Sequence, residues 1–325
     1  MRGTYLLKAI TDALWAITPE GFMVLSEVVR LHAAGERLTP DEIRARIGAA
    51  RLEAELHAVE TEAALQNQAA AGGGSGQGGT IAVMPLFGSI VPRASLMTEV
   101  SGLASAEGFG KKFQAALADS NVSGIVIDIN SPGGAVPGME ELSTDIYKAR
   151  GQKPVVAIAN HLAASAAYWI GTAADELWVT PSGEVGSIGV FAVHEDWSKR
   201  NEMDGVKMTY LKAGKYKAEG NPDEPLSEEA KTYYESRVAE AYDMFVKAVA
   251  RNRGVPVDQV RNGFGEGRVV GAKEAVKLGM ADRIGTLSEA ITAVAKRARS
   301  AQPVASRSEA EELELRQRRA RALTL

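Results

Sequence analysis

The sequence GIVIDINSPGG, residues 124–134, joins the pattern of a buried strand to a sharp turn. Its first part is a short apolar run rich in β-branched residues, which is typical of a strand buried on both faces of a parallel sheet. The paired glycines that follow let the backbone turn sharply and expose its N–H groups. Ligands of open α/β sheets bind at this carboxyl edge of the strands. Because Pro-Gly-Gly also forms ordinary turns, the stretch predicts a strand and a candidate loop, without giving the loop a function.

The same strand pattern occurs twice more, on either side of this stretch. It recurs at residues 81–87 (IAVMPLF) and 154–160 (PVVAIAN), and helices are predicted between the strands at 109–118 and 139–150. Strands that alternate with helices form βαβ units, so we predict an α/β fold with a parallel sheet covered by helices. A long helix is predicted over 227–253, with its first serine as the N-cap and the following glycine as its stop.

One glycine- and serine-rich stretch divides the chain. Residues 69–79 (AAAGGGSGQGG) have the composition of a flexible linker. We predict a helical N-terminal arm over 1–68, one domain over 80–290 and a charged C-terminal tail over 291–325. The bases of the tail outnumber its acids, which is typical of a solvated segment or of a docking segment for an acidic partner.

Composition excludes several classes of site. The chain has no cysteine, which rules out disulfides, a thiolate nucleophile and cysteine-ligated metals. Its formal net charge of −4 gives no reason to expect a nucleic-acid or anionic-membrane partner. No apolar run reaches the roughly 18 residues of a membrane span, and Lys8 and Asp12 interrupt the apolar run that a signal peptide needs. We therefore expect a cytoplasmic protein without a membrane span, a metal or a cofactor.

A serine among small residues follows the third predicted strand, in HLAASAAYW at 161–169. Small neighbours leave the Oγ of Ser165 uncrowded, and the free N–H groups at the start of a helix stabilise negative charge. A serine nucleophile and its oxyanion need both features. The same serine could instead cap the helix or let it pack closely.

Two kinds of base could serve that serine. Residues 213–222 (AGKYKAEGNP) form a loop dense in lysine and glycine. Loop lysines are usually solvated, whereas a catalytic lysine must be held in surroundings of low polarity, so that its neutral amine is available near pH 7. His161 lies four residues before Ser165 and is the competing base. His194, after the strand-like run 188–193, is expected to be structural or exposed.

Five motifs, in this order, resemble the signal peptide peptidase A family and the related phage prohead proteases, which share the Clp-protease fold. They are NSPGG, AASAAY before TAAD, GSIGV, GKYK with its Gly-x-x-Lys spacing, and GRVVGAKEAVKLGMAD. The resemblance runs from about residue 81 to residue 285. Each motif alone is weak, but their shared order is specific.

The resemblance implies roles for five residues. Ser165 matches the nucleophile, and Lys217 matches the general base. Ser187 matches a serine that orients the lysine, and the backbone N–H groups of Gly134 and Ala166 match the oxyanion donors. The choice of Lys217 over Lys212 and Lys215 depends on the Gly-x-x-Lys spacing alone.

This family membership would make the chain a serine endopeptidase with a Ser-Lys dyad and without metal or cofactor. As a phage or prophage prohead protease it would cut polypeptides such as scaffold or capsid precursors, in the bacterial host cytoplasm or within a prohead. Only one copy of the motif set occurs, so we expect a homo-oligomer. A soluble bacterial peptidase that degrades released peptides is the alternative. A catalytically inert capsid assembly or binding module is the alternative of another class.

Overall fold

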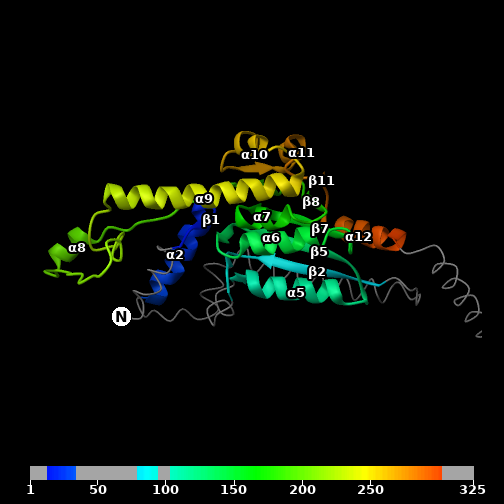
Figure 1. Cartoon of the computed structure of the whole chain (residues 1–325). Coiled ribbons are helices and arrows are strands. Elements are labelled where there is room, and N and C mark those ends of the chain that lie inside the picture. Colours follow the sequence, from blue (N-terminus) through cyan, green and yellow to red (C-terminus); the bar gives the residue numbers. More distant parts are fainter. Residues whose placement is uncertain (1–12, 34–78, 94–102, 302–325) are drawn as a thin grey trace, which may run out of the picture.

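The computed structural model describes residues 13–33, 79–93 and 103–301 (Figure 1). The rest of the predicted arm, nearly all of the predicted linker and the part of the predicted tail from residue 302 onward lie outside the described residues. The predictions made for these stretches are therefore not assessed by the structure.

A seven-stranded, mostly parallel sheet forms the centre of the described part of the chain, which confirms the predicted fold class. Its three longest strands are parallel neighbours, and they match the three runs predicted from sequence. The strands are β2 (Thr80–Phe87), β5 (Val122–Ser131), β7 (Val155–Ala164), β8 (Glu176–Val179), β9 (Glu184–Gly186), β10 (Val269–Gly271) and β11 (Arg283–Ile284).

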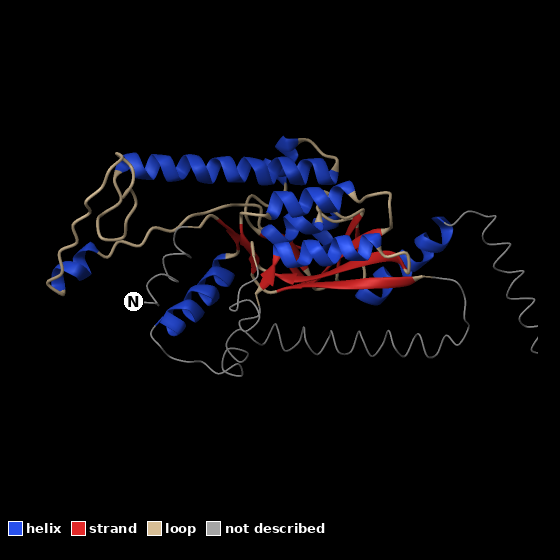
Figure 2. Ribbon diagram, turned by 60° about the horizontal axis from the view of Figure 1, so that its bottom comes forward, coloured by secondary structure: helices blue, strands red, loops and turns tan. Residues whose placement is uncertain are grey.

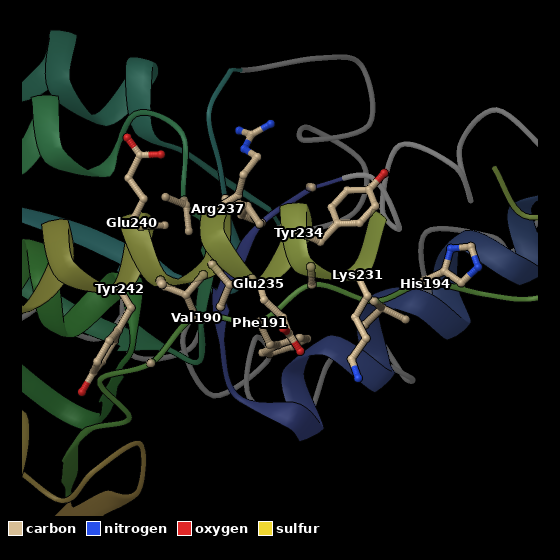
Figure 3. Close-up of a pocket in the computed structure, with 18 of the residues that line it drawn as sticks. Val190, Phe191, His194, Lys231, Tyr234, Glu235, Arg237, Glu240 and Tyr242 are labelled. Atoms are coloured by element: carbon tan, nitrogen blue, oxygen red, sulfur yellow. The ribbon is translucent and has the colours of Figure 1, made fainter. Parts of the chain in front are cut away.

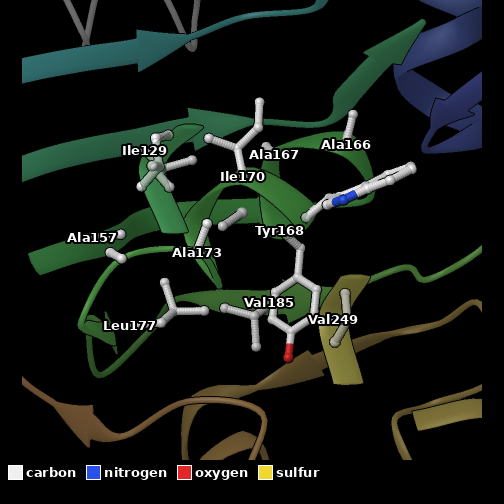
Figure 4. Packing of buried hydrophobic residues seen from close by; sticks show 14 of the residues in the cluster. Ile129, Ala157, Ala166, Ala167, Tyr168, Ile170, Ala173, Leu177, Val185 and Val249 are labelled. Atoms are coloured by element: carbon white, nitrogen blue, oxygen red, sulfur yellow. The ribbon is translucent and has the colours of Figure 1, made fainter. Parts of the chain in front are cut away.

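Helices cover both faces of this sheet (Figure 2). Alternate residues of β5 show why: Ile125 and Ile127 face the main core, whereas Val126 faces a second cluster under the last helix. The main core interleaves side chains of the sheet with those of the helices above it (Figure 4). Its helices are α5 (Ala106–Ala118), α6 (Met139–Lys148), α7 (Ala166–Gly171) and α9 (Glu228–Arg253), while α12 (Leu287–Ala301) covers the other face.

The long helix α9 begins and ends where the sequence predicts. The Ser227 Oγ accepts a hydrogen bond from the Ala230 N–H at 3.2 Å, and Gly254 ends the helix in the left-handed conformation. The large buried side chains of α9, such as Phe245, lie in its second half. Its first half extends beyond the sheet, together with α8 (Ser198–Met203) and the segment between them (Figure 1). Two short helices, α10 (Val257–Gly263) and α11 (Ala272–Leu278), follow α9.

A small second sheet changes the predicted division of the chain. Its strands are β1 (Trp15–Ile17), β6 (Gly133–Ala135), β3 (Ile90–Val91) and β4 (Ala104–Ser105), in that order. Strand β1 and the following helix α2 (Pro19–Ala33) belong to the stretch that we assigned to a separate arm. Because β1 pairs with β6, at least this part of the arm packs against the domain that we assigned to residues 80–290.

Two further expectations differ from the structure. The predicted domain boundary at residue 290 falls inside α12, whose Ala290 and Val294 are fully buried against the sheet. Residues 291–301 are therefore part of the domain and do not form a solvated tail. The strand-like run 188–193 forms a single bridge, between Phe191 and Trp15, and otherwise lacks strand pairing.

Candidate active site

The glycine loop after β5 is held in a conformation that other residues would not tolerate. The Ser131 Oγ donates to the Gly88 carbonyl at 2.6 Å and accepts from the Gly133 N–H at 3.2 Å. Gly133 has φ +104°, in the region that favours glycine. A Cβ on Gly134 would lie 1.9 Å from the Ile90 carbonyl oxygen. The backbone of Ala16 lies against Gly133 and that of Ile90 against Gly134, so neither position has room for a side chain.

Ser165 lies at the junction between β7 and α7, as predicted. Its backbone has φ +54° and ψ −119°, a conformation that is strained for a residue with a side chain. Its N–H donates to the Gly186 carbonyl at 2.7 Å. The side chain makes no capping hydrogen bond to α7, and its Oγ lies 3.5 Å from the Gly189 carbonyl oxygen, at the outer limit of a hydrogen bond. The Oγ of Ser165 is therefore not committed to capping the helix.

The loop and the serine lie against each other. A Cβ placed on Gly133 would be 2.9 Å from the Cβ of Ser165. Gly134 follows in the same loop, and Ala166 is the first residue of α7. The predicted oxyanion donors thus follow the carboxyl ends of the neighbouring strands β5 and β7, next to Ser165.

Ser187 completes this group. It follows β9 directly, has φ +52° and is 7% exposed. Its N–H donates to the Arg268 carbonyl at 2.8 Å, which ties it to the loop before β10.

Lys217 lies elsewhere. It is exposed, in the segment between α8 and α9, and its N–H donates to the Gly214 carbonyl at 3.2 Å. Figure 1 shows this segment at the outer end of α9, away from α7. Among the described hydrogen bonds, none joins the side chains of Lys217 and Ser165. The two members of the predicted dyad are therefore not brought together within one copy of the chain.

The neighbouring lysine has a different environment. The Lys215 Nζ lies 2.7 Å from the Glu229 carboxylate and 2.9 Å from the Tyr216 hydroxyl. The hydrogen bond to Glu229, followed by the one to Tyr216, raises the pKa of Lys215. A general base must be unprotonated before it can accept a proton, and a raised pKa favours the protonated amine, so Lys215 is poorly suited to that role.

The competing histidines are not placed to serve Ser165. His161 lies on β7 with an exposed side chain, and the described hydrogen bonds of Ser165 do not include it. His194 lines a groove of about 1420 Å³ between α9 and residues 188–195 (Figure 3). This groove reaches the site through Gly189, whose carbonyl faces the Ser165 Oγ.

One part of the site was missed by our sequence analysis. Strand β1 pairs with the glycine-loop strand β6 and, through Trp15, with Phe191. It thus lies beside Ser165, although a three-residue strand carries no periodic signal from which it could have been predicted.

The described residues contain no group of three or more histidine, aspartate or glutamate side chains placed to hold a metal ion. No helix within the described ranges is long and apolar enough to cross a membrane.

Comparisons with known proteins relate the chain to proteases. The chain is 35% identical over 215 residues to the head-tail preconnector protein GP5 of Enterobacteria phage P21. The aligned region covers 66% of this chain and 42% of that protein. It is 33% identical over 212 residues to the capsid assembly protease C of Escherichia phage lambda. That alignment covers 65% of this chain and 48% of the lambda protein. The chain therefore spans less than half the length of these two relatives.

The structure also superposes on that of a ClpP1 mutant from Listeria monocytogenes, with a TM-score of 0.41 and 16% sequence identity. The superposition covers 64% of this chain and 94% of the ClpP1 chain. Residues 148–301, which include Ser165, Ser187 and Lys217, match the model of peptidase family S49. This stretch, just under half of the chain, belongs to peptidase family S49.

Proposed function

We propose that the chain is a serine endopeptidase in which Ser165 is the nucleophile and Lys217 of a second copy is the general base. The observation that carries the proposal is the strained junction at Ser165, packed against the glycine loop. Strain at a strand-to-helix junction persists only where the surrounding structure enforces it, and it is concentrated at functional sites.

The chemistry follows from these positions. The Ser165 Oγ attacks the carbonyl carbon of the scissile peptide, and the amine of Lys217 takes its proton. The N–H groups of Gly134 and Ala166 hold the oxyanion that forms, a contribution of about 3–4 kcal/mol per donor in comparable sites. Ser187, at the end of the neighbouring strand, orients the incoming amine.

Self-association supplies what one copy lacks. The segment that carries Lys217 extends from the body and presents exposed apolar side chains, with Leu211 97% and Met203 87% exposed. Apolar side chains gathered on one projecting segment are typical of an interface. We propose that this segment packs against another copy, so that the Lys217 amine leaves water and reaches Ser165. Loss of water around the amine favours its neutral, basic form.

The substrate that we propose is a scaffold or capsid precursor of a phage, cut in the host cytoplasm or within a prohead. Similarity to a capsid assembly protease and to a head-tail preconnector protein supports this choice. The presence of both Ser165 and Lys217 argues against an inert assembly module.

The test is a matched pair of serine variants. The Ser165→Ala variant is expected to lose both labelling by a fluorophosphonate probe and cleavage of a co-expressed capsid precursor. The control is Ser182→Ala, an exposed serine in the turn between β8 and β9, which should keep both. If the Ser165→Ala variant still cleaves, the proposed nucleophile is wrong.

A further inference from the structure

Strand β1 lies in the candidate site in the manner of an extended peptide. On one side, Trp15 exchanges two backbone hydrogen bonds with Phe191: its N–H donates at 2.9 Å and its carbonyl accepts at 3.0 Å. On the other side, β1 pairs with β6 in antiparallel register. The strand is therefore held between two backbone segments. Main-chain hydrogen bonds of this kind also bind extended peptides in β-strand addition.

The register places one residue opposite the loop's second glycine. Ala16 pairs with Gly134, and Ile17 pairs with Gly133. The pairing is bracketed by two further bonds, from the Thr18 N–H to the Pro132 carbonyl and from the Val136 N–H to the Leu14 carbonyl, each 2.9 Å. Gly134 is one of the two proposed oxyanion donors, so the residue that faces it is the one whose carbonyl would be attacked.

The Ala16–Ile17 peptide bond lies close to the nucleophile. The position of a Cβ on Gly133 would be 2.3 Å from the Ala16 carbonyl oxygen, 3.0 Å from the Ile17 Cα and 2.9 Å from the Ser165 Cβ. The Ile17 Cα and the Ser165 Cβ therefore lie within about 6 Å of each other, since both are within about 3 Å of one point.

Burial shows that the strand covers the site. Ser165 is 1% exposed, and Ala16 is not exposed at all. Trp15 and Ile17 are also buried, in a cluster that includes Ala135 of β6 and Leu25 of α2. A polypeptide substrate cannot occupy the same place beside Ser165 while β1 remains there.

We propose that residues 14–18 are bound as the chain's own first substrate and that the bond between Ala16 and Ile17 is a self-cleavage site. This inference depends on the proposed function of Ser165 and Lys217. It goes further by naming the bond that is cut and the consequence of cutting it: removal of residues 1–16 exposes the site beside Ser165 to other polypeptides.

The reaction would consume one water and no other reactant. The Ser165 Oγ forms an ester with the Ala16 carbonyl carbon while the C–N bond to Ile17 breaks. The proton taken from Ser165 by the lysine passes to the leaving nitrogen, which becomes the new amino terminus of Ile17. Water then hydrolyses the ester, which releases a peptide that ends in the Ala16 carboxylate and regenerates the serine.

The experiment follows intact mass and N-terminal sequence of the purified full-length chain over time, at protein concentrations that allow self-association. We expect a product that begins at Ile17, and we expect the Ser165→Ala variant to keep residues 1–16. Degradation of added β-casein is measured in the same samples, and it should rise as the product accumulates.

A matched pair of variants tests the register. Ala16→Gly still fits the buried position and should be cut. Ala16→Leu adds three carbons where Ala16 is fully enclosed, so the strand should leave the site and the bond should stay intact. Degradation of casein by the Ala16→Leu variant would show that its fold is preserved.

Three results would overturn the inference. Degradation of casein by the unmodified chain with the Ala16–Ile17 bond intact would refute self-cleavage and leave the proposed function standing. Cutting only at other bonds would do the same. Failure to cut either casein or itself would refute the proposed function, and the inference with it.

Discussion

Ser165 and Ser187 follow directly after paired residues of two neighbouring parallel strands, and both have positive φ. Ala164 of β7 is the register partner of Gly186 of β9, and the next residue on each strand is the serine. Their φ angles are +54° and +52°. Since such conformations cost of order 1–3 kcal/mol each, two at adjacent strand ends indicate a site that the fold is built to hold.

The proposed role of Ser187, to position the lysine, predicts that its loss acts on turnover. If its hydroxyl orients the incoming lysine, Ser187→Ala should lower kcat by about 10- to 100-fold, the effect of one lost hydrogen bond, with KM for a peptide substrate nearly unchanged. The Ser182→Ala variant is the control. Steady-state kinetics check the split, and a rise in KM at constant kcat would instead assign Ser187 to substrate binding.

Gly133 should be irreplaceable for a steric reason, beyond its backbone conformation. Gly133→Ala would place a methyl group 2.3 Å from the Ala16 carbonyl oxygen and 2.9 Å from the Ser165 Cβ. We expect a loss of peptidase activity of at least about 100-fold, because the nucleophile or the oxyanion loop must move.

Gly151→Ala is the matched control for this substitution. Gly151 also has positive φ, +80°, but a Cβ there would meet no atom within 4 Å. It should cost about 1 kcal/mol of stability, the backbone penalty alone, and leave activity unchanged. Denaturant unfolding and a casein assay compare the two, and equal activity losses would contradict the steric argument.

The separation of Lys217 from Ser165 predicts complementation between inactive variants. Ser165→Ala and Lys217→Ala should each be inactive alone. Mixed in equal amounts after dissociation and reassembly, they should recover about a quarter of normal activity, since half of the serines are intact and half of those meet an intact lysine across a head-to-tail interface.

Lys215→Ala is the control for this experiment. Lys215 is engaged with Glu229, so its loss should leave most of the activity in place. Absence of any recovery in the mixture, together with a stable oligomer of normal size, would show that the lysine does not come from a second copy.

The main sheet could be predicted from sequence because its three long strands contain short apolar runs rich in β-branched residues, and Ser165 could be placed because it lies among small residues that follow one of them. Strand β1 could not be predicted. Its three residues pair with Gly133–Ala135, a segment without β propensity, more than a hundred positions away. The position of Lys217 was equally hidden, because the path of an exposed loop depends on packing that the loop's own residues do not encode.

Helix α12 shows a different kind of error. Ala290, Val294 and Ala298 recur every four residues and form its buried stripe. The bases between them led us to predict a solvated tail. One of these, Arg297, instead pairs with Glu176 at the start of β8. Periodicity should therefore have outweighed charge in setting this boundary.

The last prediction concerns the stability of the domain rather than its activity. Arg253, at the end of α9, donates from both terminal nitrogens to Asp282, at 2.6 and 2.8 Å, and from Nε to the Gly279 carbonyl at 3.0 Å. The Arg253 side chain is 9% exposed. The same Asp282 carboxylate accepts the Leu177 N–H at 2.7 Å, which ties α9 to β8.

Removal of the carboxylate charge would leave this guanidinium buried without its counter-charge. Asp282→Asn should therefore lower the free energy of unfolding by about 3 kcal/mol, as expected when one partner of a buried pair is lost. The control is Glu274→Gln in the Lys277–Glu274 pair, whose side chains are 75% and 52% exposed. Exposed pairs contribute about 0.5 kcal/mol or less.

Urea unfolding of the two variants measures the difference between their free energies of unfolding. Both variants carry Ser165→Ala as a shared background to prevent self-digestion. Equal losses would show that the Arg253–Asp282 pair contributes no more than a surface pair.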